Sequence, residues 1–315
     1  IGCYETVLNG DPGWGQPEVV VRFGSVPTSK WLNGWLDTGD RGLGIRDRDE
    51  IPVPSPQIHI RGDGVWSDDS HRVSEYVQAD EALTCRALAQ RIDRGASDWT
   101  RQLLATEERF WSAALNSLHE EWWDASAVAA LIDALPDGCN LFLGNSLPIR
   151  HVDQFARPSG KRLRVYGNRG ASGIDGVTSS ALGVAAADPT TPTVLLTGDI
   201  SFYHDLNGLL AVKQQNLTNV TIVLLNNDGG SIFRRLPIAG EEPVFNRLFL
   251  TPHGLDFAPV IRMYGLEHAQ ADSRESLQTA LAASIQSRTP TVIEVQTDGA
   301  RDEELRRALG RKLRG

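Results

Sequence analysis

The chain has 315 residues, of which 41% are hydrophobic, and a formal net charge of −9 at pH 7. This length can form two domains of ordinary size, each with its own core. The acidic balance argues against a nucleic-acid partner, because contacts to phosphates require a basic surface, and no apolar run is long enough for membrane insertion. The cysteines Cys3, Cys85 and Cys139 are widely spaced and predict neither a disulfide framework nor a zinc site. We therefore expect a cytoplasmic protein.

In the first part of the chain, strands are expected to alternate with helices. Pro27-Thr28-Ser29 is typical of a helix start, since Ser and Thr side chains cap the first free N–H groups. Strands that alternate with helices predict a parallel α/β sheet. The expected elements are a strand at Val19–Phe23, a helix from Lys30 to about Leu36, a turn-rich stretch at Thr38–Pro56, strands at Gln57–Arg61 and Val73–Val77, and helices at Asp80–Ile92 and from Asp98 to about Trp122.

A sharp change in composition indicates a domain boundary near residue 123. All eight Trp residues lie at or before Trp123. We therefore predict one α/β domain over residues 1–123 and a second over residues 124–315, each a doubly wound, mostly parallel sheet.

The second part shows a clearer alternation of strands and helices. Its apolar strands end in polar, glycine-containing turns, as in open α/β sheets. The expected helices are Ala125–Ala134, Thr178–Ala187, Asp205–Gln215, about Phe257–Tyr264, Ser273–Ser287 and Arg301–Leu313, and the expected strands are Asn140–Leu143, Leu163–Tyr166, Thr193–Thr197, Val220–Leu225 and Thr291–Gln296.

Four successive strands of this second part end in clusters of Gly, Asn, Asp and Ser. In open α/β sheets, ligands bind at the carboxyl ends of the strands. A single polar strand end is an ordinary loop, but four together favour a ligand pocket. The clusters are Gly144-Asn145-Ser146, Gly167-Asn168-Arg169-Gly170, Gly198-Asp199 and Asn226-Asn227.

Two of these clusters, Gly198-Asp199 and Asn226-Asn227, carry the chemistry of a magnesium site. One strand–helix–strand crossover separates them, so Asp199 and Asn227 should lie at the same edge of neighbouring parallel strands. A carboxylate, an amide oxygen and a free carbonyl in a glycine turn form a set of hard oxygen ligands. Mg²⁺ completes such a set with water and substrate phosphates. The Ser201 hydroxyl and nearby backbone N–H groups would then hold the phosphate.

The alternative interpretation is that both clusters are simple turns, because Gly, Asp and Asn dominate turns in any case. For either motif alone this interpretation is the better one. For the pair, each member following an apolar strand, a functional site is favoured. The chain has no GxGxxG dinucleotide loop and no GxxxxGK[ST] loop.

The motifs together resemble thiamin-diphosphate enzymes, and within them the MenD-type 2-succinyl-5-enolpyruvyl-6-hydroxy-3-cyclohexene-1-carboxylate synthases of menaquinone and phylloquinone biosynthesis. The superfamily signature is GD(G) followed by NN, and Ile200 replaces its second glycine here. The resemblance covers essentially the whole chain. Its most specific element is the block Asn168-Arg169-Gly170-Ala171-Ser172-Gly173-Ile174-Asp175-Gly176, and it also includes Gly144 to Arg150, Asp205 to Leu209, Asn227 to Phe233, Arg22-Phe23-Gly24 and Pro27 to Lys30.

This resemblance implies a transferase that decarboxylates 2-oxoglutarate on thiamin diphosphate and adds the resulting succinyl carbanion to isochorismate. The implied metal is Mg²⁺, with Mn²⁺ as a substitute. Its implied ligands are Asp199, Asn227 and the Gly229 carbonyl, and Gly198, Ile200 and Ser201 complete the implied contacts to the cofactor.

The resemblance also implies roles for residues around the substrates. Ile174 would be the apolar wedge that holds the cofactor bent, and Ile232 and Phe233 would line the pocket near the reacting ring. The substrate carboxylates would be bound by Ser146, Arg150, Arg169 and Lys30. Trp31 stands where some members have Arg, which puts in question the contribution of the first domain to isochorismate binding.

Each of these residues also has a purely structural interpretation. Arg150 and Arg169 could be surface ion-pair partners, and Ile174 and Phe233 could be core residues. His204 and His253 lie beside motifs, but local hydrogen bonding explains a loop histidine equally well.

Thiamin catalysis in this superfamily requires a glutamate from a pyrimidine-binding domain, normally the N-terminal one and often from a partner subunit. We expect that domain to be absent from these 315 residues, so that the chain is the middle and diphosphate-binding part of a longer homodimer or homotetramer and is inactive alone. Two alternatives stay open. One is another thiamin-diphosphate enzyme, such as a 2-oxo-acid decarboxylase or an acetolactate synthase, and the other is a non-catalytic cofactor-binding module.

Overall fold

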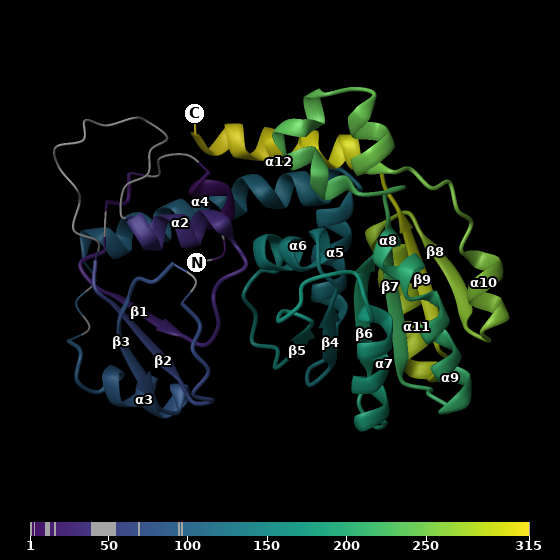
Figure 1. Ribbon diagram of the computed structural model, residues 1–315, viewed down its shortest axis with the longest axis horizontal. Coiled ribbons are helices and arrows are strands. Elements are labelled where there is room, and N and C mark those ends of the chain that lie inside the picture. The colour runs from purple at the N-terminus through teal and green to yellow at the C-terminus, as the bar shows by residue number, and fades with distance from the viewer. Residues whose placement is uncertain are drawn as a thin grey trace. The chain divides into compact units, whose positions relative to one another are not determined.

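The computed structural model describes residues 2, 4–9, 13–15, 17–38, 55–68, 70–93, 95 and 97–314. The chain divides into two compact units: Ile1–Ala113 with Gly310–Gly315, and Ala114–Leu309 (Figure 1). The division falls within the long helix α4 (Asp98–Glu120), and the assignment of domains to residues 1–123 and 124–315 stays a prediction. Cys3 and most of the expected turn-rich stretch Thr38–Pro56 lie outside the described residues.

The first unit contains a three-stranded parallel sheet in the order β1-β2-β3. Helix α3 begins after Asp80, whose side chain accepts a hydrogen bond from Leu83 N at 2.7 Å and so caps the helix. The elements of this unit, apart from α4, are α1 (Tyr4–Val7), β1 (Val20–Phe23), α2 (Lys30–Thr38), β2 (Gln57–Arg61), β3 (Val73–Gln78) and α3 (Glu81–Ala89).

The second unit is built on a six-stranded sheet in the order β5-β4-β6-β7-β9-β8, and every neighbouring pair in it is parallel. The prediction of an α/β fold with parallel sheets is therefore confirmed. The strands are β4 (Asn140–Leu143), β5 (Arg164–Gly167), β6 (Thr193–Gly198), β7 (Val220–Asn226), β8 (Glu267–Ala271) and β9 (Thr291–Gln296).

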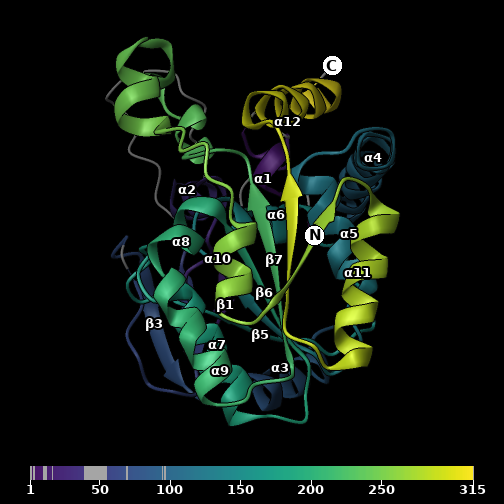
Figure 2. The same cartoon turned by 90° about the vertical axis from the view of Figure 1, so that its right-hand side faces the viewer.

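Helices cover both faces of this sheet. Alternate residues of a strand point to opposite faces, so Val223 and Leu225 of β7 pack into one hydrophobic core while Ile222 and Leu224 pack into the other. The first core includes α5 and α11 and the second includes α7, α9 and α10, as Figure 2 shows on the two sides of β6 and β7. The α-helices are α5 (Asp124–Ala134), α6 (Leu147–Phe155), α7 (Val177–Ala187), α8 (Asp199–His204), α9 (Leu210–Gln214), α10 (Ala258–Met263), α11 (Arg274–Ser287) and α12 (Gly299–Arg314).

Several elements differ from the expectations. The helix expected at Asp205–Gln215 is broken into the 3₁₀ helix η1 (Leu206–Leu209) and α9. Strand β8 was not expected, because Glu-His-Ala-Gln-Ala lacks the β-branched residues typical of strands. Other elements that were not expected are α1, α6, α8, the 3₁₀ helices η2 (Ser231–Arg235) and η3 (Pro237–Gly240), and the π-helical turn η4 (Asn246–Leu250).

The strand order creates a reversal at β4. The chain passes from β4 to β5 on one side and then returns to β6 on the other. Ligands of open α/β sheets bind beyond the carboxyl ends of the strands at such a reversal, and this is the edge at which all four polar clusters lie. Among the helices of the described residues, none combines the length and the apolar composition that crossing a bilayer requires.

Candidate functional site

Asp199 joins the ends of two neighbouring strands. It follows β6 directly and is the first residue of α8, with 3% of its surface exposed. Its Oδ1 accepts a hydrogen bond from Ile200 N at 2.7 Å, and its Oδ2 accepts one from Gly229 N at 2.9 Å. Because Gly229 follows β7, the parallel neighbour of β6, two of the three predicted metal ligands are in direct contact.

Burial raises the pKa of the Asp199 carboxyl, and the hydrogen bonds from Gly229 and Ile200 partly oppose this rise. A buried carboxylate is costly unless a positive charge or several hydrogen bonds compensate it. A divalent cation would supply that charge. The electrostatics of Asp199 therefore fit a metal ligand.

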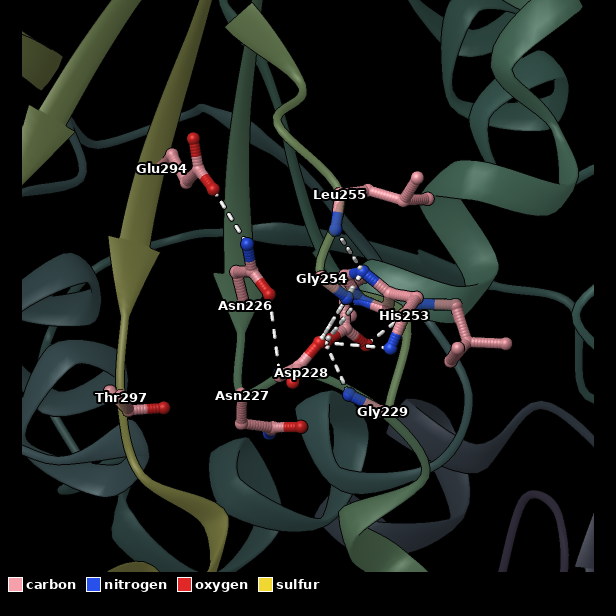
Figure 3. A network of polar contacts seen from close by, with 12 residues as sticks. Asn226, Asn227, Asp228, Gly229, His253, Gly254, Leu255, Glu294 and Thr297 are labelled. Atoms are coloured by element: carbon pink, nitrogen blue, oxygen red, sulfur yellow. Dashed lines mark hydrogen bonds and ion pairs between the residues drawn. The ribbon is translucent and has the colours of Figure 1, made fainter. Parts of the chain in front are cut away.

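A short loop holds His253 against this carboxylate. Asp228, which has a left-handed φ of 56°, accepts hydrogen bonds at Oδ1 from His253 N at 2.9 Å and Gly254 N at 2.7 Å (Figure 3). The Nδ1 atom of His253 accepts a hydrogen bond from Leu255 N at 3.0 Å. In the neutral ring the other nitrogen then carries the hydrogen, and this Nε2 lies 3.3 Å from Asp199 Oδ2. His253 thus faces the predicted metal ligand.

The adjacent residues Asn226 and Asn227 differ in how their side-chain oxygens are used. Asn226 donates from Nδ2 to Glu294 Oε1 at 2.6 Å, and its Oδ1 accepts from Asp228 N at 3.2 Å (Figure 3). Asn227 donates from Nδ2 to Asp124 Oδ2 at 2.9 Å, but its Oδ1 is buried and has no hydrogen-bond partner among the described residues. A buried acceptor without a partner is unfavourable, and a cation at this oxygen would satisfy it.

Gly229 has a backbone that only glycine adopts easily. Its φ is +136°, and a Cβ at this position would lie 2.2 Å from the Leu250 carbonyl oxygen. The Gly229 carbonyl accepts from Ser231 N at 2.9 Å, and a carbonyl oxygen keeps a second lone pair. Within the described part of the chain, no group of three or more His, Cys, Asp and Glu residues is arranged to hold a metal. The oxygens of Asp199, Asn227 and Gly229 are instead a mixed set of the kind that Mg²⁺ takes.

A second cluster lies at the ends of β4 and β5. Asn145, with 4% of its surface exposed, donates from Nδ2 to the carbonyls of Asn168 at 3.2 Å and Gly173 at 2.7 Å. Its Oδ1 accepts from Arg169 Nη1 at 2.8 Å, and Arg150 Nη1 donates to the Ser146 carbonyl at 2.7 Å. Ser146 has the rare backbone angles φ 70° and ψ −130° for a residue other than glycine. The structure thus brings Arg169 to the loop that ends at Ser146, directly before the helix α6 that carries Arg150.

The remaining predicted site residues lie in four places. Ile174 is half-buried in the turn before α7, and Ser201 is buried in α8 beside the half-buried Ile200. Ile232 and Phe233 lie in η2, and the Phe233 ring packs edge-on against Phe249 at 5.8 Å between ring centres. Lys30 is exposed in the first unit, and its Nζ lies 4.9 Å from the centre of the Trp31 ring.

The structure adds a buried carboxyl pair that the sequence motifs did not indicate. Asp124, the first residue of α5, is fully buried, and it accepts from Thr297 Oγ1 at 2.6 Å as well as from Asn227. The carboxyl of Asp302 lies against it, and burial together with the charge of Asp124 raises the pKa of Asp302 to about 9. An Asp at a helix start is an ordinary cap in sequence terms, so no local signal distinguished Asp124.

The carboxyl pair predicts a pH dependence of stability. The folded protein keeps the Asp302 proton that the unfolded chain releases above about pH 4, so Asp302 lowers the free energy of unfolding as pH rises from about 4 toward 9. Asp302→Asn should raise the free energy of unfolding at pH 8 by more than about 1 kcal/mol and flatten its decline between pH 5 and 8. Urea denaturation of the metal-free protein at several pH values measures this. Equal slopes for both proteins would contradict the prediction.

Comparisons with known proteins identify relatives of the chain. Residues 152–295 match the family model described as "Thiamine pyrophosphate enzyme, C-terminal TPP binding domain". This match and the parallel sheet with its polar strand ends define the class of this part of the chain, the C-terminal TPP-binding domain of thiamine pyrophosphate enzymes.

Three curated relatives carry the name 2-succinyl-5-enolpyruvyl-6-hydroxy-3-cyclohexene-1-carboxylate synthase. The protein from Roseiflexus sp. (strain RS-1) is 48% identical over 315 residues, which is 100% of this chain and 52% of the relative. The protein from Roseiflexus castenholzii is 49% identical over 310 residues, covering 98% and 51%. The protein from Halobacterium salinarum is 40% identical over 315 residues, covering 100% and 51%. The chain belongs to the family of these synthases, and it spans about half the length of the curated relatives it matches.

Proposed function

We propose that the chain is part of a transferase that uses thiamin diphosphate and Mg²⁺ to decarboxylate 2-oxoglutarate and to add the succinyl unit to isochorismate, in menaquinone or phylloquinone biosynthesis. The names of the relatives support the reaction. The observation that carries the proposal is the unpartnered Oδ1 of Asn227 beside the Asp199–Gly229 contact. This arrangement leaves an acceptor for a cation at the carboxyl ends of two strands, within the residues that match the TPP-binding domain model.

The metal would be held by Asp199, Asn227 and the Gly229 carbonyl, and Mn²⁺ would substitute for Mg²⁺ because both take oxygen ligands. Ile200 N is already bonded to Asp199. We therefore propose that Ser201 and the backbone at Gly198 supply the remaining contacts to the diphosphate. Bound thiamin diphosphate supplies the electron sink that decarboxylation of a 2-oxo acid requires.

Both proposed substrates carry carboxylates, and guanidinium groups bind carboxylates through paired hydrogen bonds. We assign this role to Arg150 and Arg169, with Ser146 beside them, because hydrogen bonds already connect these residues to the loops at the ends of β4 and β5. Lys30 is proposed as a further substrate-binding residue. The apolar side chains of Ile174, Ile232 and Phe233 would hold the cofactor and exclude water from the reacting atoms.

We further propose that the chain is the middle and diphosphate-binding part of a longer cytoplasmic homodimer or homotetramer, here called the full-length enzyme. The share of the relatives that it covers supports this proposal. The glutamate that activates the cofactor would then come from a pyrimidine-binding domain outside these residues.

Two assays test the function. The full-length enzyme should release CO2 from 2-oxoglutarate with thiamin diphosphate and Mg²⁺, and it should form the adduct only when isochorismate is present. Products of acetolactate-synthase or simple decarboxylase type, unchanged by isochorismate, would support the rival enzyme class. The absence of both cofactor binding and turnover would support a non-catalytic module.

The 315-residue chain alone is expected to show no 2-oxoglutarate decarboxylation, because the activating glutamate is missing from it. Release of CO2 from labelled 2-oxoglutarate, with the full-length enzyme as the positive control, measures this. Turnover by the isolated chain at even one hundredth of the full-length rate, roughly a 3 kcal/mol difference in barrier, would contradict this part of the proposal.

A further inference from the structure

The orientation of the Asn227 side chain determines whether a bound metal would face its amide oxygen or its amide nitrogen. The amide oxygen is an acceptor and the amide nitrogen carries two hydrogens. Only the oxygen can coordinate a cation. A rotation of the amide by half a turn would therefore replace a ligand by a repulsive N–H group.

Asp124 determines this orientation in the structure. Its Oδ2 accepts from Asn227 Nδ2 at 2.9 Å, across 103 positions of the chain. Its other oxygen accepts from Thr297 Oγ1 at 2.6 Å, from the segment that follows β9. The carboxylate is fully buried, so water does not compete for it. Because Asp124 Oδ2 accepts the hydrogen bond from the nitrogen of Asn227, the amide oxygen of Asn227 points away from Asp124.

The neighbouring Asn226 makes a similar hydrogen bond to a carboxylate, but its amide oxygen has a partner and that of Asn227 does not. Asn226 also donates to a buried carboxylate, that of Glu294, at 2.6 Å. Its oxygen, however, is used locally by Asp228 N at 3.2 Å. For Asn227, the oxygen that Asp124 turns away is buried without a hydrogen-bond partner among the described residues. A buried acceptor without a partner is unfavourable, and a cation at this oxygen would satisfy it.

We propose that Asp124 is a positioning residue for the metal site, which holds the Asn227 amide so that its oxygen faces the cation. Thr297 in turn holds Asp124. This inference rests on the proposed function, because it assumes that Asn227 is a metal ligand. Asp124 itself does not touch the metal in this proposal.

The test is the Mg²⁺ affinity of the full-length enzyme, measured by calorimetry in saturating thiamin diphosphate. Loss of the partner that orients a metal ligand typically costs about 10–100-fold in affinity, and we expect Asp124→Ala to fall in this range. The matched control is Asn219→Ala. Asn219 lies at the opposite end of β7 and donates to three carbonyls, so this variant loses a buried polar network without touching the site. It should keep its affinity within about threefold, a difference under 1 kcal/mol.

A double-mutant cycle separates positioning from general destabilisation. If Asp124 acts only through Asn227, then Asp124→Ala should have no further effect on Mg²⁺ affinity in an Asn227→Ala background. Additive losses would overturn the proposal. If Asp124→Ala does not fold, Thr297→Val provides the second measurement, because it removes only the hydrogen bond that holds Asp124. A measurable loss of affinity is expected there, and wild-type affinity in Thr297→Val would then refute the inference.

The cycle also distinguishes failure of the metal site from failure of the positioning role. Unchanged Mg²⁺ affinity in Asn227→Ala would show that the proposed metal site is wrong. A loss in Asn227→Ala together with wild-type affinity in Asp124→Ala would leave the metal site standing and refute the role of Asp124 alone.

Discussion

Replacement of Asp199 by alanine is expected to abolish Mg²⁺-dependent binding of thiamin diphosphate, with an affinity at least about 100-fold lower, or roughly 2.7 kcal/mol. Asp199 is the only carboxylate in the proposed ligand set, so the variant loses the charge that attracts the cation. It also loses the acceptor for Gly229 N, which fixes the loop that carries the other two ligands. Calorimetric titration of the full-length enzyme with cofactor, with and without Mg²⁺, measures the effect.

The matched control for this experiment is Asp137→Ala. Asp137 is a half-exposed carboxylate that pairs with Arg162, before the start of β4 and therefore at the opposite edge of the sheet. Its removal should leave the affinity for the cofactor unchanged. Wild-type affinity in Asp199→Ala would show that the diphosphate is held elsewhere.

The second large effect is expected for Gly229→Ala. The new Cβ would lie 2.2 Å from the Leu250 carbonyl oxygen, and that oxygen cannot move away freely because it accepts from Gly230 N at 2.7 Å. The φ of +136° adds strain for any residue with a side chain. We expect the free energy of unfolding to fall by about 3 kcal/mol or more, together with the loss of metal binding.

Gly254→Ala is the control for this substitution. Gly254 also has a positive φ, +57°, but a Cβ at this position would meet no other part of the described chain within 4 Å. Gly254→Ala should therefore lower the free energy of unfolding only by the cost of the left-handed backbone, about 1–2 kcal/mol. Urea denaturation of the two variants compares them directly, and equal stabilities would mean that the turn at Gly229 relaxes without cost.

The sequence was most informative where a strand is buried on both faces. The strands at Gln57–Arg61, Asn140–Leu143 and Thr291–Gln296 have the bounds that were expected, because each is an apolar or alternating run between polar turns. Strand β8 has no such run. It lies at the edge of the sheet, where it pairs with β9. The helix expected from Asp205 breaks because Gly208 is a poor helix residue and the Asp205 side chain accepts from Ser179 N and Oγ, at 2.7 and 2.9 Å.

The candidate site was predictable only in its local parts. That Asp199 and Asn227 follow parallel neighbouring strands could be inferred from one crossover, and β6 and β7 are such neighbours. Asp124 and Thr297 are separated by 173 positions, and only the folded sheet brings them together. No periodicity or turn motif in the sequence indicates a contact between residues so far apart in the chain. Sequence patterns therefore indicate which residues could bind a ligand, while the residues that orient them become visible only in three dimensions.

The bonding of Asn145 has a consequence for redesign of this protein. Its amide connects the Asn168 and Gly173 carbonyls and the Arg169 guanidinium to the end of β4. These hydrogen bonds connect the loop after β4 to the loop after β5. The position of the Arg169 guanidinium therefore depends on Asn145, which follows β4. A loop of different specificity grafted after β5 would need a compatible residue at position 145. Without one, the cationic side chain of the new loop would lack the hydrogen bond that Arg169 makes to Asn145.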